Sequence, residues 1–215
     1  MVYFRFEDDR HDVIHDDSNN DNVGKLITPA STESFSETCG KGLVLNGGAL
    51  LLSGDSFKNK PEIAMTISCW INIMKTTEHG ILFSTLGGPS SSYKSEEYVI
   101  EITAGKFRCS HRNKAGKLVF ELTSHQTLKS NTWNYVACSY DSQLHQAVVF
   151  VNGKQDAAGR GQGKLSRDWE AKASIGSSQS KDGLYAKIDD FFMADTALNE
   201  KEVTRLMDQC LFQKG

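Results

Sequence analysis

Apolar and polar residues alternate along residues 65–73 of the chain. Met65, Ile67, Cys69, Ile71 and Ile73 fall on one side of this alternation, and Thr66, Ser68, Trp70 and Asn72 fall on the other. A period of two over this length is typical of a strand with one buried face. We therefore predict a half-buried strand here.

A second strand is predicted at residues 133–140, where Val136 and Cys138 share a face. Residues 141–144 read as a turn, and an apolar run then returns through residues 148–151 to Asn152-Gly153. Asn-Gly is the strongest short-range hairpin signal. The pattern therefore predicts a strand followed by a hairpin.

Turn signals and short apolar runs recur along the rest of the chain and predict further strands. These are residues 2–7, two strands with a tight turn in 40–52, 80–86, 98–102, 106–111, 117–122, 173–176 and 183–193. Asn199 is placed to cap a short helix whose Val203, Leu206 and Met207 would face the core. At 215 residues without a linker-like tract, the chain is expected to be one all-β domain.

Several of these motifs resemble laminin G-like and pentraxin-like domains. They are Cys69-Trp70, Trp133, Asn152-Gly153-Lys154, and the closing Ile175-Gly176 and Ile188-Asp189-Asp190, within a match that runs over residues 2–207. The resemblance implies a concanavalin-like jelly roll, a two-sheet antiparallel β-sandwich with one short C-terminal helix. It also implies a single domain over residues 1–215 that binds, adheres or scaffolds.

Five cysteines lack the CxxC spacing of a zinc or redox site. In pentraxins the two cysteines that match Cys69 and Cys138 form a disulfide, so the resemblance implies this pair, which would close a loop of 70 residues. Cys39 and Cys210 could pair as well, because domain termini often lie close together. Cys109 would remain, either buried or free to bond another chain. The alternative is an intracellular protein with five reduced thiols.

The formal charge of −3 is close to neutral for this length, which argues against a general role at nucleic acids or membrane surfaces. No apolar run approaches 18 residues, so membrane insertion is not expected. Met1 is followed directly by a strand-like segment instead of the apolar core of a signal peptide. We expect a module of a longer, secreted or extracellular protein.

A calcium site is the sharpest chemical candidate. Carboxylate and amide oxygens, which Ca²⁺ prefers, gather in the polar loop after the first strand, and two more carboxylates lie on the closing strand. The candidate ligands are Asp16, Asp17, Asn20, Asp21, Asp189 and Asp190. The spacing departs from an EF-hand loop. The alternative is that the loop is a solvated turn and that Asp189 or Asp190 bonds nearby backbone N–H groups.

A basic hairpin is the second candidate. It carries Lys106, Arg108, Arg112, Lys114 and Lys117, with His111 among them. Summed charge on one hairpin could hold a sulfated glycan or another polyanion. The alternative is a soluble edge hairpin whose lysines discourage sheet-to-sheet aggregation. If Cys109 points inward, Arg108 and Ser110 point outward.

Catalysis is not expected. Glu96, Glu97 and Glu101 could supply the carboxylate pair of a glycosidase, but no one-strand alternation of acidic residues accompanies them. The six histidines lack catalytic partners in sequence. The leading prediction is a non-catalytic extracellular module for a glycan, a polyanion or a matrix protein, including a biomineral matrix. The alternatives are a purely structural protein–protein interaction domain and, third, a glycoside-active sandwich.

Overall fold

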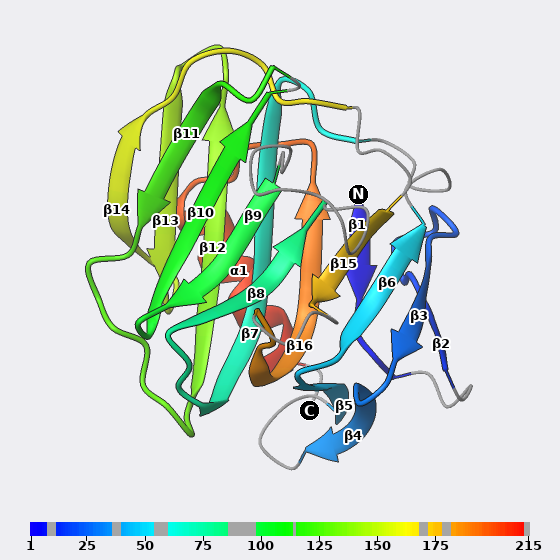
Figure 1. The fold of residues 1–215 in the computed structure, drawn as a ribbon. Coiled ribbons are helices and arrows are strands. Elements are labelled where there is room, and N and C mark those ends of the chain that lie inside the picture. The colour runs from blue at the N-terminus through cyan, green and yellow to red at the C-terminus, as the bar shows by residue number, and fades with distance from the viewer. Residues whose placement is uncertain are drawn as a thin grey trace.

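The computed structural model describes residues 1–7, 12–35, 40–53, 60–85, 98–113, 115–167, 172–177 and 182–212. These residues form two antiparallel β-sheets stacked face to face, here named sheet A and sheet B (Figure 1). One helix accompanies the sheets among the described residues. The predicted two-sheet β-sandwich with a single C-terminal helix is therefore confirmed.

Sheet A has the order β14-β13-β12-β7-β16-β5-β4, and β1 also pairs with β16. Its strands are β1 (Val2–Phe4), β4 (Ser31–Phe35), β5 (Gly40–Asn46), β7 (Ala64–Lys75), β12 (Trp133–Asp141), β13 (Gln146–Val151), β14 (Lys154–Arg160) and β16 (Tyr185–Ala194). Sheet B has the order β11-β10-β9-β8-β15-β6-β3-β2. Its strands are β2 (Val13–His15), β3 (Val23–Ile27), β6 (Ala49–Ser53), β8 (His79–Ser84), β9 (Tyr98–Thr103), β10 (Lys106–Arg112), β11 (Leu118–Thr123) and β15 (Lys172–Gly176).

The main core lies between the two sheets and contains the residues that the alternation predicted. The apolar face of β7 from Met65 to Ile73 is buried there, and so are Val136 and Cys138 of the neighbouring β12. The hairpin from β13 to β14 turns at Asn152 and Gly153, which both have positive φ (51° and 76°). Asn-Gly tolerates this conformation best, which explains the turn.

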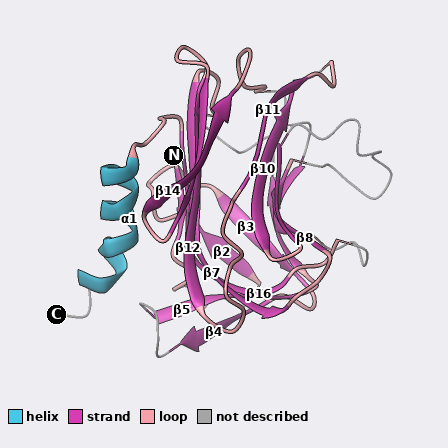
Figure 2. Cartoon of the chain, turned by 90° about the vertical axis from the view of Figure 1, so that its left-hand side faces the viewer, coloured by secondary structure: helices cyan, strands magenta, loops and turns pink. Residues whose placement is uncertain are grey.

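The helix α1 (Glu200–Phe212) covers the outer face of sheet A, on the side of the sandwich away from β8 and β10 (Figure 2). Asn199 caps it as predicted, because its Oδ1 accepts from the N–H of Glu202 at 3.2 Å while Glu202 accepts from the N–H of Asn199 at 2.8 Å. Val203 is fully buried, but against Tyr135 and Phe150 in a second, smaller cluster. The helix therefore closes a core of its own on the outside of the sandwich.

The N-terminal region contains more regular structure than the sequence suggested. The loop that follows β1 was expected to be irregular, yet β2 and β3 form within it and extend sheet B. Conversely, the strand expected at residues 2–7 is only three residues long. Short strands with few apolar residues give little periodic signal, which explains the difference.

The disulfide between Cys69 and Cys138 is not formed. Both residues are buried free thiols on neighbouring strands, as expected of strands in one sheet, but Cys69 lies opposite Val136 and Cys138 lies opposite Ile67. Such a diagonal offset separates the Cα atoms by about 7–8 Å, whereas the Cα atoms of a disulfide are usually about 4.4–6.8 Å apart. Cys39 lies outside the described residues, and Cys210 lies in α1, so the second predicted pair is not tested.

Within the described residues, the only helix is α1, and it is too short and too polar to cross a bilayer.

Candidate functional site

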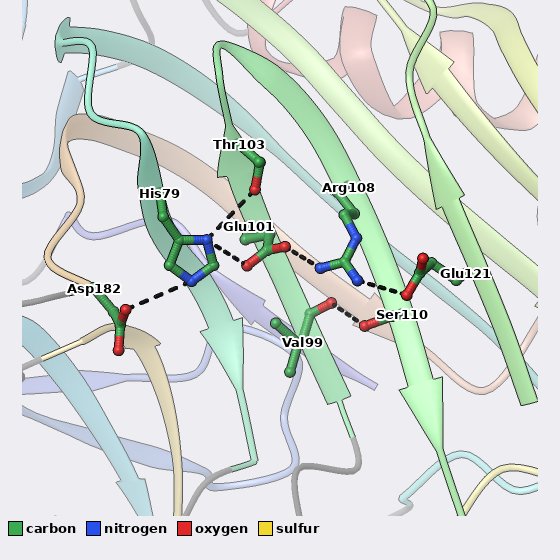
Figure 3. Close-up of polar contacts among 8 residues, drawn as sticks. All are labelled: His79, Val99, Glu101, Thr103, Arg108, Ser110, Glu121 and Asp182. Carbon is green, nitrogen blue, oxygen red and sulfur yellow. Dashed lines mark hydrogen bonds and ion pairs between the residues drawn. The ribbon is translucent and has the colours of Figure 1, made fainter. Parts of the chain in front are cut away.

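A row of charged side chains crosses the outer face of sheet B. Glu101 of β9 and Arg108 of β10 are directly opposite each other in the register, His79 comes from β8 and Glu121 from β11. The core side of these strands carries Ile100, Ile102, Phe107 and Cys109, so the alternation of each strand points the charged residues outward. Asp182, which precedes β16, joins the row at the His79 end (Figure 3).

Arg108 forms the centre of the row. Its Nη1 donates to Oε1 of Glu101, and its Nη2 donates to Oε2 of Glu121 at 2.5 Å. On the other side of Glu101, Oε2 lies 2.9 Å from Nδ1 of His79. The Nε2 atom of His79 is in turn 3.6 Å from Oδ1 of Asp182 (Figure 3). Five charged or titratable groups from four strands and one loop are thus joined in one line.

Burial falls off along the row from Glu101 toward Glu121. The side chain of Glu101 is 2% exposed, that of Arg108 is 28% exposed and that of Glu121 is 38% exposed. Burial disfavours the charged form of Arg108 and by itself would lower its pKa. The hydrogen bonds and negative charges of Glu101 and Glu121 outweigh burial, so the pKa of Arg108 is raised. A buried carboxylate is costly unless it is paired and hydrogen-bonded. The row therefore holds its charged groups in fixed positions.

The basic hairpin does not present its cations as one patch. Cys109 points inward and Arg108 and Ser110 point outward, as the alternation predicted, but Arg108 is paired with two carboxylates. His111 is fully buried and packs against Tyr98 at a ring distance of 4.2 Å.

The remaining basic residues of this hairpin are arranged as follows. Lys106 is half-buried, and Nη1 of Arg112 donates to the carbonyl of Gly116 at 3.4 Å. Lys117 is exposed near the hairpin end, and Lys114 lies outside the described residues. The cluster seen in sequence is therefore divided between the network, the core and the hairpin end.

Asp16 organises the loop after β2 through hydrogen bonds from the protein itself. Its carboxylate accepts from the N–H of Tyr3 at 2.8 Å, from the N–H and hydroxyl of Ser18 at 2.8 and 2.7 Å, and from Nδ2 of Asn22 at 2.5 Å. Asn20 donates to the carbonyl of Met1 at 2.9 Å. The bonds to Asp16 use both oxygens of its carboxylate.

The first and last strands of the chain lie side by side. Tyr3 of β1 donates to Oδ1 of Asp190 at 2.6 Å, and the N–H of Arg5 donates to Oδ2 of Asp17 at 3.2 Å. Burial is the main cause that raises the pKa of Asp190, and the charge of Asp17 adds to it. Asp189 is buried and its Oδ1 accepts from the N–H of Asp190 at 2.8 Å.

Protein donors already bind two of the six predicted calcium ligands. Asp16 is saturated by protein donors, Asp190 accepts from Tyr3, and among the described residues no three acidic, histidine or cysteine side chains are grouped so that they could hold a metal. The alternative weighed from sequence, a closing-strand carboxylate bound to a nearby backbone N–H group, describes Asp189. A calcium ion stays a prediction.

A hollow of about 210 Å³ lies on the opposite side of the sandwich, beside the start of α1. Its lining includes Leu144, Phe150, Leu198 and Glu200. Pockets for small ligands usually measure about 300–1,000 Å³, so this hollow is small for the purpose. The outer face of sheet B remains the better candidate because its polar groups are fixed.

Sequence reasoning missed the pairing of Glu101 with Arg108, although a signal for it existed. Ala104 and Gly105 form a two-residue turn with φ of 48° and 75°. Such a turn fixes the register, and it places residue 101 opposite residue 108. The contact between His79 and Asp182 joins residues a hundred positions apart and has no comparable local signal.

A protein-family model described as the concanavalin A-like lectin/glucanases superfamily matches residues 46–204. No curated protein sequence matches the chain. Among solved structures, the binding domain of Paraclostridial Mosquitocidal Protein 1 is similar with a TM-score of 0.73 at 16% identity, over 96% of this chain and 51% of that one.

Two further structures show the same fold. The receptor binding domain of botulinum neurotoxin C/D mosaic serotype is similar with a TM-score of 0.72 at 14% identity, over 97% of this chain and 51% of that one. This chain therefore spans about half the length of the toxin domains. Domain 4 of AbnA, a GH43 extracellular arabinanase from Geobacillus stearothermophilus solved with arabinotriose, has a TM-score of 0.73 at 17% identity, over 95% of this chain and 96% of that one.

Proposed function

Because the chain belongs to the laminin G-like part of the concanavalin A-like lectin/glucanases superfamily, we propose that it is a module that binds a neutral glycan on the outer face of sheet B. The similar structures are receptor-binding domains and a domain solved with a trisaccharide, which supports a binding role. The observation that carries the proposal is the fixed row from His79 through Glu101 and Arg108 to Glu121.

Sugar hydroxyl groups donate and accept hydrogen bonds, so a glycan suits a surface that offers both kinds of group in fixed positions. Glu121 is 38% exposed and offers carboxylate oxygens, while Arg108 is 28% exposed and offers N–H groups. Hydrogen bonds to charged groups are stronger than those between neutral groups. Because the network already holds these side chains in place, they lose little conformational entropy when a glycan binds.

The charge of this face favours a neutral glycan over a polyanion. Glu101, Glu121 and Asp182 contribute three negative charges, while Lys106 and Arg108 contribute two positive charges, so these five groups sum to −1. A polyanion would gain no electrostatic attraction from a face with this charge. Sulfated glycans would depend instead on Arg112 and Lys117 near the end of the hairpin.

Binding without hydrolysis is the form that the geometry supports. A glycosidase places the reacting bond between two carboxylates. Here the guanidinium of Arg108 lies between Glu101 and Glu121 and bonds to both. A sugar could therefore lie over the row, but its glycosidic oxygen could not enter between the two carboxylates while Arg108 is there.

An extracellular location belongs to the same proposal, because laminin G-like domains typically work outside cells and glycans are displayed there. The partner would be a cell-surface or matrix glycan, with a protein partner as the alternative.

The test is an array of neutral and sulfated oligosaccharides, with arabinotriose among the neutral ones, followed by calorimetric titration. We expect neutral binders whose affinity falls at least about tenfold in Glu121→Ala, since a hydrogen bond to a charged group contributes about 1.5–3 kcal/mol. Glu62→Ala is the matched control. Glu62 is also an exposed carboxylate in an ion pair, with Lys164 at 3.1 Å, and its removal should change nothing.

Binding of sulfated chains alone, lost in Arg112→Ala and Lys117→Ala, would replace this proposal with the polyanion function. Binding to no glycan would leave the protein–protein alternative in its place.

A further inference from the structure

The hollow of about 210 Å³ beside the start of α1 lies against the outer face of sheet A. Ser139 of β12 and Val148 of β13 line it and are directly opposite each other in the register, and Phe150 follows two positions along β13. These three side chains are buried and point away from the main core. Leu198, from the segment before α1, and Gln155 of β14 also line the hollow. The sheet side of the hollow is therefore largely apolar.

Leu144 adds exposed apolar surface to the same hollow. It lies in the turn between β12 and β13 and is 71% exposed, the largest fraction among the exposed large apolar side chains of the described residues. A single exposed leucine needs no explanation by itself. Leu144, however, lines the hollow together with Val148 and Phe150. An exposed apolar residue beside a pocket is typical of a surface that contacts another protein.

The charged side chains at the hollow are acidic. Among the described lining residues they are Asp141 and Glu200. Oδ1 of Asp141 accepts from the N–H groups of Gln143 and Leu144 at 2.8 and 3.0 Å. Oε2 of Glu200 accepts from the N–H of Gln155 at 2.8 Å, and this bond is the main cause that lowers the pKa of Glu200. Backbone donors thus hold both carboxylates in place at the hollow.

Glu200 already attracts a cation from the chain itself. Nζ of Lys154 lies 3.4 Å from Oε1 of Glu200, and the two side chains are 75% and 46% exposed. Exposed ion pairs of this kind contribute little to stability, so Lys154 can be displaced at small cost. Glu200 is therefore accessible to a cation from another molecule.

We propose that the hollow is a docking site for a segment of another protein that inserts one arginine side chain. The methylene groups of the arginine lie against Val148, Phe150 and Leu198, and its guanidinium donates to Asp141 and Glu200. Long basic side chains bury their stem on apolar surface while their charged head stays at polar groups. A hollow that is small for a free ligand is large enough for one side chain.

The chemistry of the hollow also selects the rest of the partner. Arginine suits it better than lysine, because the planar guanidinium carries several N–H groups and can bond to two carboxylates. An apolar residue next to the arginine would cover Leu144, while acidic neighbours would be repelled by Asp141 and Glu200. The expected partner is thus a basic and apolar segment. This inference is independent of the glycan face, which belongs to sheet B.

The test is an array of synthetic peptides of about ten residues, each with one central arginine between varied neighbours, probed with the whole chain. The best binder is then titrated by calorimetry beside versions with lysine, citrulline or glutamate at the centre. Citrulline has the shape of arginine without its charge. We expect the affinity to fall at least about tenfold with citrulline, because hydrogen bonds between charged groups are the stronger ones, and to be lost with glutamate.

Variants of the chain locate the binding. Glu200→Gln and Asp141→Asn keep an acceptor oxygen for the backbone N–H groups and remove only the charge, so each should weaken the arginine peptide several-fold. Leu144→Ser should weaken it as well, and Lys154→Met should strengthen it because a competing cation is removed. Glu62→Gln is the matched control. Glu62 is also an exposed carboxylate paired with a lysine, at 3.1 Å, and its replacement should change nothing.

Three results would overturn the proposal: no binding of any arginine peptide, equal binding of the citrulline version, or wild-type affinity in both Glu200→Gln and Asp141→Asn. Self-association of the chain that disappears in Leu144→Ser would assign the hollow to a second copy and would overturn it too. The comparison of arginine with citrulline uses the wild-type chain, so it does not depend on whether a variant folds.

Discussion

The hydroxyl of Tyr3 donates a 2.6 Å hydrogen bond to Oδ1 of Asp190, which joins the first strand to the last over 187 positions of sequence. Asp190 has a positive φ of 49° and lies where the register between β16 and β7 shifts. Such a bulge redirects side chains away from the regular alternation. The bond therefore holds β1 against the irregular part of β16.

Asp190 predicts a pH dependence of stability. Burial raises its pKa in the folded state, opposed by the bond from Tyr3. The folded state thus holds this proton more tightly than the unfolded state, whose pKa is about 3.9. The contribution to stability is complete below that pH and is lost as the pH rises through the folded pKa.

Asp190→Asn removes this titration and keeps an oxygen for Tyr3. We measure the free energy of unfolding in urea from pH 3.5 to 7. The value for the variant minus that for the wild type is expected to increase as the pH rises. Parallel curves over the whole range would contradict the assignment.

Replacing Arg108 of the network is expected to cause a large loss of stability. Arg108→Met leaves the charge of Glu101, with its side chain 2% exposed, without its main partner. Removing one partner of a buried pair costs about 3–5 kcal/mol. Urea unfolding would measure the loss.

Lys164→Met is the control, because its pair with Glu62 is exposed on both sides (64% and 41%) and such pairs contribute about 1 kcal/mol or less. The double variant Glu101→Leu with Arg108→Met should recover stability relative to Arg108→Met alone. Equal, small effects of Arg108→Met and Lys164→Met would show that the network is not coupled in this way.

The turn between β13 and β14 packs closely against α1, so a larger residue in this turn should lower stability. Gly153→Ala places a Cβ atom 3.1 Å from Cε of Met207 and 3.2 Å from Oγ1 of Thr204, in addition to the strain of φ 76°. The strain alone costs about 1–2 kcal/mol. Gly163→Ala is the comparison, because its φ is 95° and nothing lies within 4 Å of the new Cβ. Gly153→Ala should be the more destabilising of the two, and the reverse order would contradict the contact with the helix.

Chelation tests the calcium prediction. Because protein donors occupy Asp16 and Tyr3 occupies one oxygen of Asp190, we expect the thermal midpoint to be unchanged by a chelator. A fall of several degrees in the wild type that is absent in Asp17→Ala and Asp190→Ala would instead establish calcium at these residues.

The alternation of residues 65–73 correctly predicted which face of β7 lies in the main core. The expectation of a half-buried strand was wrong, because Thr66, Ser68 and Asn72 on the other face are buried as well. The family match confirms the resemblance seen in the motifs. β2 and β3 were missed because three to five residues with mixed polarity carry no clear period.

Contacts between strands were harder to predict than the strands themselves. The resemblance implied that Cys69 and Cys138 lie close together, and they are on neighbouring strands, but their offset of two residues depends on a register that no local pattern fixes. The basic hairpin was interpreted as a patch because charges were counted along one segment. Glu101 neutralises Arg108 from the preceding strand, which only the turn at Ala104 and Gly105 makes apparent.

The most direct test of the binding face is an amide chemical-shift titration of the ¹⁵N-labelled protein with the neutral oligosaccharides. The account predicts shifts confined to β8–β11 and to residues around Asp182, with β13 and α1 unaffected. Shifts centred on the hollow beside α1, or an unchanged spectrum with every neutral oligosaccharide, would contradict it.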